Sequence, residues 1–304
     1  MKERIVIRNV SKNIRGKAII KDINLSIEPG EIYGLLGPNG AGKTTTIRMM
    51  TGLMKPTGGS IMINGFDLNK DFEKAISSVG AVVENPEMYD YLSGYDNLLH
   101  YQRMSPGVTK SQIQKVTERV GMEKRIHEKT GTYSLGMRQR LGLAQALLHE
   151  PDVLILDEPT NGLDPAGIRE IRSYLKKLAH EDGISIIVSS HLLSEMEKMC
   201  DRIAVIQDGE IITVSDVTSF IEGKEQIVTI AVTDQKKAMD VIRENLQKEA
   251  ESMETGIRMA CPREEIPNVV AVLVEQDIGI YEVKGAANVT LEEQFLELTG
   301  GRSV

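Results

Sequence analysis

The sequence predicts an α/β protein built on a mainly parallel sheet, with a glycine-rich loop after one central strand. The first observation is a set of short, nearly uninterrupted apolar runs, a pattern typical of strands buried on both faces: Ile32–Leu36, Val153–Leu156 and Ile184–Val188. The second is the helical spacing of Ile168–Ala179 between the last two runs, since strands joined through a helix lie parallel. The third is that glycines cluster directly after Leu36.

Three further segments complete the predicted core domain. Short β-branched runs alternate with polar turns from Ile5 to Ile27, which predicts an N-terminal antiparallel β subdomain. Amphipathic helical spacing from Ser93 to Glu128 predicts a helical subdomain inserted at about residues 86–150. The runs Ile203–Ile206 and Glu210–Val214, joined by an Asp-Gly turn, predict a β-hairpin.

The pattern starts afresh after residue 222, so we expect two domains, residues 1–222 and residues 223–304. The second should be a small α+β accessory domain, with strands and helices alternating at 227–232, 236–247, 256–259, 266–276 and 279–283. A short extra strand at 252–254 would give it a ferredoxin-like character. Near the end of the chain, Thr290 and Glu293 form a capping box at the start of a further predicted helix.

Composition and charge restrict the function. Of the 304 residues, 41% are apolar and 26% are charged, and the net charge is -8, so a broad basic face for nucleic acid is not expected. The N-terminus lacks the apolar stretch of a signal peptide, and no segment reaches the roughly 20 apolar residues that span a bilayer, which predicts a cytosolic chain. Cys200 and Cys261 are far apart without companion ligands, so we expect neither a disulfide framework nor a zinc site.

The glycine-rich segment after Leu36 satisfies G-x-x-x-x-G-K-[ST], the phosphate-binding P-loop, with Gly37, Pro38, Asn39, Gly40, Ala41, Gly42, Lys43 and Thr44. In such a loop the backbone N–H groups face the phosphates, and the following helix, continuing from Thr45, adds the positive end of its dipole. Lys43 should reach the β- and γ-phosphates, and the Thr44 hydroxyl should ligate Mg²⁺. We therefore expect these residues to form an ATP site.

Two acids end the strand predicted at Val153–Leu156, in the manner of a Walker B motif. Asp157 is placed to hold Mg²⁺, and Glu158 could polarise the attacking water as general base. Acids at strand ends are also common for solvation alone, so the pair gains its meaning from the P-loop in the same chain.

A third motif, S-x-G-M-x-Q-R, begins at Ser134, shortly before the Walker B strand. With it, the chain resembles the ATP-binding cassette (ABC) family from Ile5 to about Phe220. The resemblance implies that two copies stack head to tail, so that Ser134 and Gly136 contact ATP held by the P-loop of the other copy. Asp164 ends a segment that resembles the D-loop of the family, and the resemblance places it at the same composite site.

His191 follows the strand predicted at Ile184–Val188 and resembles the switch histidine of the family. A neutral imidazole there could bond the γ-phosphate and help to orient the water and Glu158. Ser134 also has the features of an ordinary helix N-cap, and the two roles are compatible.

Two positions depart from the family pattern. Where the family stacks adenine on an aromatic residue, this sequence has Ile14, whose apolar contact, with a stack on the Arg15 guanidinium, could replace part of that interaction. Glu84 stands in place of the usual Q-loop glutamine and could ligate Mg²⁺ directly or through water. A glutamate here resembles the bacitracin- and lantibiotic-type subgroup of antimicrobial-peptide transporters, although a neutral single substitution would look the same.

The resemblance implies an ATP-hydrolysing subunit that powers a separate membrane permease and exports an antimicrobial peptide, a drug or another amphipathic substrate. Its partners would be the permease and a second copy of itself, without nucleic acid, and it would be cytoplasmic and bound to the inner face of the membrane through the permease. The aromatic and methionine residues of Glu87–Leu92 are the candidate permease surface. The alternatives are a cassette ATPase without a permease and a nucleotide-dependent regulatory module.

Overall fold

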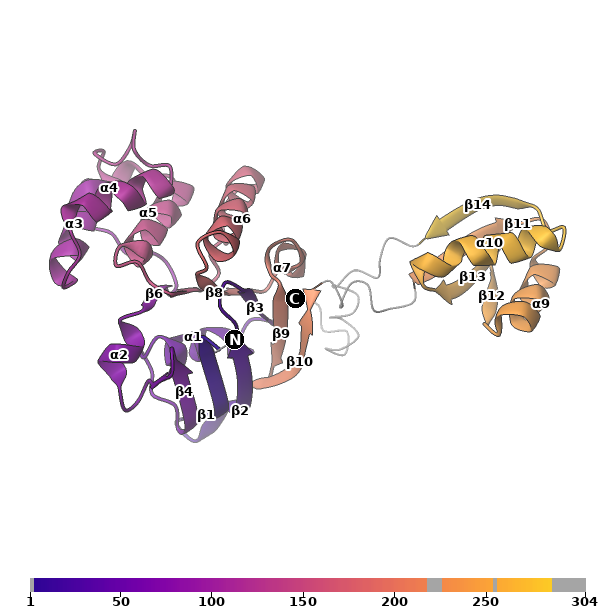
Figure 1. Ribbon diagram of the computed structural model, residues 1–304, viewed down its shortest axis with the longest axis horizontal. Helices are drawn as coiled ribbons and strands as arrows, with labels where there is room; N and C mark the ends of the chain where they lie inside the picture. Colours follow the sequence, from indigo (N-terminus) through magenta and orange to yellow (C-terminus); the bar gives the residue numbers. More distant parts are fainter. Residues whose placement is uncertain (1–2, 218–225, 254–255, 286–304) are drawn as a thin grey trace. The chain divides into compact units, whose positions relative to one another are not determined.

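Two compact units make up the chain, Met1–Asp216 and Val217–Ser303. The computed structural model describes residues 3–217, 226–253 and 256–285 (Figure 1). The predicted domain boundary, between residues 222 and 223, and the predicted helix at Thr290 lie outside the described residues. Within those residues, no helix combines the length and the apolar character required to cross a lipid bilayer.

The first unit is built around a six-stranded sheet with the strand order β10-β9-β3-β8-β7-β6. All neighbouring strands run parallel except β10, which is antiparallel to β9. Every residue of β3, β7 and β8 is buried, which explains their largely apolar sequences and confirms the predicted α/β class. The strands are β3 Ile32–Leu36, β6 Val79–Val82, β7 Val153–Leu156, β8 Ser185–Ser190, β9 Arg202–Gln207 and β10 Glu210–Asp216.

Four neighbouring strands of this sheet, β3, β8, β7 and β6, end at the same edge because they are parallel. Helix α1 (Lys43–Met50) follows β3, helix α6 (Pro165–His180) connects β7 to β8, and helix α7 (Leu193–Met199) follows β8. The loops at this edge carry the P-loop, the Walker B acids, His191 and Glu84. In open α/β sheets, this carboxyl edge is where ligands bind.

An antiparallel sheet with the order β2-β1-β4-β5 shares a hydrophobic core with β3 and β7. For this sheet the sequence predicted strands only between Ile5 and Ile27, and the structure adds β4 and β5 from beyond the P-loop helix. β4 pairs with β1, which is distant in the sequence, so no local turn or hairpin pattern indicates the pairing. The elements are β1 Ile5–Ile14, β2 Lys17–Ile27, β4 Gly58–Ile63, β5 Phe66–Asp67 and the short helix α2 Phe72–Ile76.

A helical insert lies between β6 and β7 in the sequence. It contains α3 (Gly94–Met104), α4 (Lys110–Arg119), a 3₁₀ turn η1 (Thr130–Thr132) and α5 (Leu135–Leu147). Ser93 caps α3 by accepting a hydrogen bond from the N–H of Asp96 (3.0 Å), the type of contact that starts a helix at serine.

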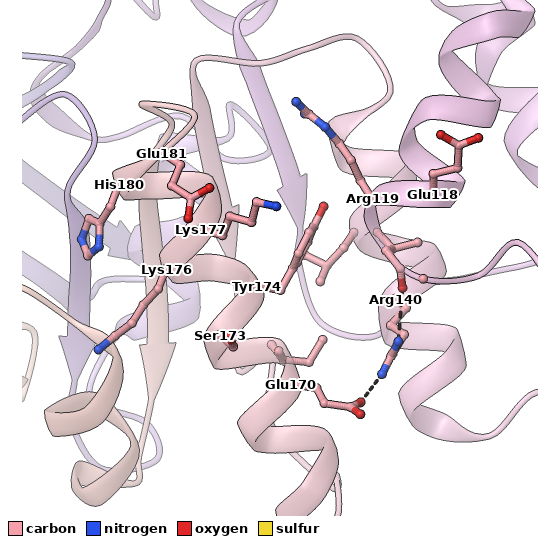
Figure 2. Close-up of a pocket in the computed structure, with 14 residues that line it drawn as sticks. Glu118, Arg119, Arg140, Glu170, Ser173, Tyr174, Lys176, Lys177, His180 and Glu181 are labelled. Atoms are coloured by element: carbon pink, nitrogen blue, oxygen red, sulfur yellow. Dashed lines mark hydrogen bonds and ion pairs between the residues drawn. The ribbon is translucent and has the colours of Figure 1, made fainter.

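The insert and α6 line an open cavity of about 730 Å³, which shares no lining residue with the carboxyl edge of the sheet (Figure 2). Arg140 of α5 pairs with Glu170 of α6 across it. Tyr174 projects from α6 between Lys177 and Arg119 (Figure 2). The Tyr174 hydroxyl is buried and has no hydrogen-bond partner in the described part of the chain.

Replacing Tyr174 by phenylalanine is expected to leave the free energy of unfolding unchanged or to raise it by up to about 1 kcal/mol. Burial raises the pKa of this hydroxyl, so the group stays protonated. The hydroxyl loses its hydrogen bonds to water on folding, and no hydrogen bond from the described residues replaces them. Urea unfolding of both proteins measures the difference.

The matched control is Tyr133→Phe, because the Tyr133 hydroxyl donates to the carbonyl oxygen of Arg125 (2.8 Å). This control should lose about 1 kcal/mol. An equal loss in Tyr174→Phe would contradict the account of an unpartnered hydroxyl.

The second unit has the order β-α-β-β-α-β and a four-stranded antiparallel sheet, β12-β13-β11-β14. This is the ferredoxin-like arrangement, and the predicted short extra strand is β12. Val228, Ile230, Ile242 and Leu273 lie in its own hydrophobic core. The elements are β11 Gln226–Val232, α9 Gln235–Leu246, β12 Ala250–Met253, β13 Gly256–Cys261, the 3₁₀ turn η2 Arg263–Glu265, α10 Ile266–Glu275 and β14 Ile280–Gly285.

Candidate nucleotide-binding site

The P-loop joins β3 to α1 through two positions that admit only glycine. A Cβ at Gly37 would lie 2.2 Å from the carbonyl oxygen of Ile206 in β9. Gly42 has a φ of 113°, and a Cβ there would lie 2.5 Å from Cδ1 of Ile20. Gly42 is also the N-cap of α1 and has no side chain to cap it, so the first-turn N–H groups are open to an anion.

Lys43 folds back over this loop. Its ammonium donates to the carbonyl oxygens of Gly37 (2.7 Å) and Pro38 (3.3 Å) and lies 3.5 Å from Oε1 of Glu158. Only 6% of its side chain is exposed. A nearly buried ammonium beside a helix N-terminus concentrates positive charge, which suits the phosphates of a nucleotide.

A buried serine ties the two acids after β7 together. The hydroxyl of Ser189 donates to Oδ1 of Asp157 (2.6 Å) and accepts a hydrogen bond from the backbone N–H of Glu158 (2.9 Å). Both Ser189 and Asp157 are buried. This arrangement fixes the orientation of Asp157 and leaves its second carboxylate oxygen available to a metal ion.

Glu158 is held by His191. Its Oε2 lies 2.7 Å from Nδ1 of the imidazole, and since an ionised carboxylate can only accept, Nδ1 carries the proton. To bond a phosphate as well, through Nε2, the ring would need a second proton. The neutral imidazole predicted from the sequence can therefore orient Glu158 but, in this geometry, cannot also donate to the γ-phosphate.

Lys43, both acids and His191 line one cavity of about 430 Å³ at the carboxyl edge of the sheet, and Ser189 supports the acids from behind its wall. Its lining residues are Asn39, Gly40, Gly42, Lys43, Thr44, Thr45, Glu84, Asn85, Asp157, Glu158, Asn161 and His191. Gly37, Pro38 and Ala41 shape the P-loop without lining the cavity. Ile14, at the end of β1, is 37% exposed and does not line it either.

The cavity offers oxygen ligands of the kind that Mg²⁺ prefers, on Thr44, Asp157 and Glu84. Nowhere in the described ranges do three or more His, Cys, Asp or Glu side chains gather in a group that could hold a metal ion. Mg²⁺ does not need such a cage, because it usually takes one or two carboxylates together with substrate phosphates and water. The residues present therefore fit Mg²⁺ bound together with a nucleotide.

Comparison with known proteins gives the family. Residues 20–161 match the model of the ABC transporter family. Over 300 residues the chain is 54% identical to an uncharacterized ABC transporter ATP-binding protein, YhcH of Bacillus subtilis (strain 168), covering 99% of this chain and 97% of YhcH. The chain belongs to the ABC transporter ATP-binding proteins.

Other members of the ABC family are similar along most of the chain. The bacitracin transport ATP-binding protein BcrA of Enterococcus faecalis is 37% identical over 297 residues, 97% of this chain and 96% of BcrA. The dimeric structure of the ATP-binding cassette MJ0796 in a post-hydrolysis state, bound to ADP and Pi, has 26% identity and a TM-score of 0.63, covering 70% of this chain and 98% of that one. The chain is an ABC ATPase with the P-loop fold, and the resemblance inferred from its motifs is confirmed.

The signature motif of this ABC ATPase lies outside the nucleotide cavity. Ser134 is the exposed N-cap of α5 and accepts a hydrogen bond from the N–H of Met137 (3.3 Å). Asp164 is the exposed N-cap of α6. The two segments are neighbours, since a Cβ at Gly136 would lie 3.7 Å from Cδ2 of Leu163. The structure thus brings Ser134, Gly136 and Asp164 together on a surface of their own.

Three polar residues of the ABC site were not among the site residues predicted from the sequence. Ser189 orients both acids, and the available signal was a serine at the end of an apolar strand, two residues before His191. Asn85 and Asn161 line the cavity close in sequence to Glu84 and Glu158. Polar residues beside catalytic candidates on loops at the same sheet edge could have been included for that reason.

Proposed function

We propose that this ABC ATPase works with Mg²⁺ as a homodimer, in which each ATP is enclosed by the P-loop of one copy and the signature motif of the other. The supporting observation is that Ser134, Gly136 and Asp164 do not line the cavity with Lys43 and Glu158 but lie on a neighbouring surface, where Ser134 and Asp164 are exposed. The helix N-terminus at Ser134 offers N–H donors to the γ-phosphate of ATP on a second copy. The dimer of MJ0796 provides a precedent for two cassettes in contact.

The proposed reaction is attack of water on the γ-phosphate. Glu158 takes the proton of that water as general base, and His191 keeps the carboxylate oriented through Oε2. Lys43 and the N–H groups of the P-loop hold the phosphates and offset their charge. Thr44, Asp157 and Glu84 would hold Mg²⁺, which would supply further neutralisation of the phosphate charge.

A groove in the same unit is the proposed docking site of a membrane permease. It has a volume of about 380 Å³, and its lining includes Pro86, Glu87 and Tyr101. Glu87 begins the predicted permease surface Glu87–Leu92, in which the side chain of Tyr91 is 69% exposed. A permease helix in this groove would hold the ATPase at the cytoplasmic face of the membrane and would adjoin Glu84, two residues before Pro86.

The proposed substrate class is an amphipathic antimicrobial peptide, moved outward. Support comes from BcrA, which is named for bacitracin transport, and from the glutamate at position 84. Cells that express the chain with its permease should resist bacitracin, and cells with Glu158→Gln should not. Equal resistance with both proteins would contradict ATP-driven export by this chain.

Steady-state hydrolysis by the purified chain tests the dimer. With Mg²⁺ and ATP, turnover per chain should rise with protein concentration, because only a dimer has a complete site, and removing Mg²⁺ should abolish it. Turnover per chain that stays constant while light scattering shows the change from monomer to dimer would contradict a composite site.

A further inference from the structure

We propose that Arg48 is a positioning residue that competes with Mg²⁺ for the carboxylate of Glu84, and thereby sets the Mg²⁺ concentration at which the site binds ATP. This inference rests on the proposed function, in which Glu84 is a ligand of Mg²⁺. Arg48 belongs neither to the P-loop motif nor to the lining of the nucleotide cavity, so its effect would act through Glu84.

Arg48 reaches Glu84 from the face of α1 that also carries a metal ligand of the proposed site. It follows Thr44 by four residues, which places the two side chains on one face of the helix, roughly 6 Å apart at their Cβ atoms. The guanidinium Nη2 donates to Oε1 of Glu84. The guanidinium of Arg48 therefore lies on the same helix face as the Thr44 hydroxyl, which is expected to ligate Mg²⁺. Arg48 and Mg²⁺ would then compete for the carboxylate of Glu84.

The competition needs a carboxylate at position 84. A guanidinium binds an ionised carboxylate through a charge-assisted hydrogen bond, whereas a glutamine amide at the same place would be held much more weakly. The side chains of Arg48 and Glu84 are 40% and 61% exposed, and exposed ion pairs of this kind are weak. The pair is therefore strong enough to orient Glu84 and weak enough for a divalent cation to displace.

The backbone connects this exchange to the helical insert. Glu84 has a φ of 66°, in the left-handed region. Asn85 precedes Pro86 and therefore favours extended backbone. The chain thus turns at Glu84. Pro86 packs directly on α5, because a Cβ at Gly142 would lie 2.6 Å from its Cγ. Movement of Glu84 from Arg48 to the metal would therefore shift Pro86 against α5, the helix whose N-cap is Ser134.

A double-mutant cycle tests the competition. Four proteins all carry Glu158→Gln, so that bound ATP is not consumed: the parent, Arg48→Ala, Glu84→Gln and the double variant. Calorimetric titration with ATP at a series of free Mg²⁺ concentrations gives the dissociation constant of ATP at each concentration. The quantity compared between the proteins is the Mg²⁺ concentration at which half of the Mg²⁺-dependent gain in ATP affinity is reached. Arg48→Ala is expected to lower that level by about threefold to fivefold, the size expected for an exposed ion pair, and to change nothing when Glu84 is already glutamine.

Arg48→Lys is the conservative control and should keep a Mg²⁺ requirement close to that of the parent, since lysine retains the charge. A higher Mg²⁺ requirement in Arg48→Ala, or an equal shift with and without the Glu84 carboxylate, would overturn the competition. A parent that binds ATP without any dependence on Mg²⁺ would overturn the proposed function itself. Mg²⁺-dependent binding that is identical in all four proteins would overturn only the inference.

Discussion

The Glu158→Gln variant is expected to bind ATP and to hydrolyse it about 10²- to 10⁴-fold more slowly than the wild type, the usual contribution of a general base. Glutamine has nearly the shape of glutamate but cannot take the proton of the attacking water. The groups that would hold the nucleotide, Lys43, the P-loop N–H groups and the second oxygen of Asp157, are left in place. ATP should therefore remain bound, and the proposed dimer should stay closed.

Size-exclusion chromatography and single-turnover hydrolysis measure these two effects together. Glu158→Gln should elute as a dimer with Mg²⁺ and ATP and as a monomer with ADP. Glu150→Gln is a matched control, because Glu150 lies before the amino end of β7, has an exposed side chain and pairs with Lys115 (3.9 Å). Normal turnover by Glu158→Gln would exclude Glu158 as the base.

The Lys43→Ala variant is expected to lose ATP affinity by at least about 30-fold, since removing one partner of a desolvated charged contact costs on the order of 2–5 kcal/mol. The ammonium is 6% exposed, and two of its three N–H donors already meet P-loop carbonyls, so it is held in place before any phosphate arrives. Alanine removes both the charge and this preorganisation.

Calorimetric titration with ATP and Mg²⁺ measures the affinity of Lys43→Ala, and circular dichroism checks that it folds. Lys115→Ala serves as its matched control, because Lys115 lies on α4 of the helical insert, is 66% exposed, pairs with Glu150 (3.9 Å) and does not line the nucleotide cavity. Unchanged ATP affinity in Lys43→Ala would mean that the cavity is not the nucleotide site.

Local sequence patterns predicted most of the core fold and most of the candidate site. β3 and β7 are buried on both faces, so nearly all of their residues are apolar. Such a run can be recognised in the sequence without knowing which strands pair with it. β4 gives no such signal, because it is stabilised by pairing with β1, and the two strands are separated in the sequence by β2, β3 and the P-loop helix. The location of the candidate site could also be predicted, because the carboxyl ends of parallel strands lie at one edge of the sheet.

The contacts within the site were less predictable. The hydrogen bonds of Ser189 to both acids depend on the register of β8 beside β7, and the pairing of Arg48 with Glu84 depends on where a loop residue meets a helix face. The proposed composite site could not be found in a single chain, because in that proposal the signature surface at Ser134 contacts ATP bound to a second copy.

The most direct test of the composite site is to mix two inactive variants, Lys43→Ala and Ser134→Arg, and to measure ATP hydrolysis. Each variant alone should be inactive, because both sites of its homodimer contain the defect. In a mixed dimer, one site combines both defects, while the other combines an intact P-loop with an intact signature motif. Turnover should therefore return on mixing and rise with the fraction of mixed dimer. No recovery, with mixed dimers shown to form by differential tagging, would contradict a site shared between two copies.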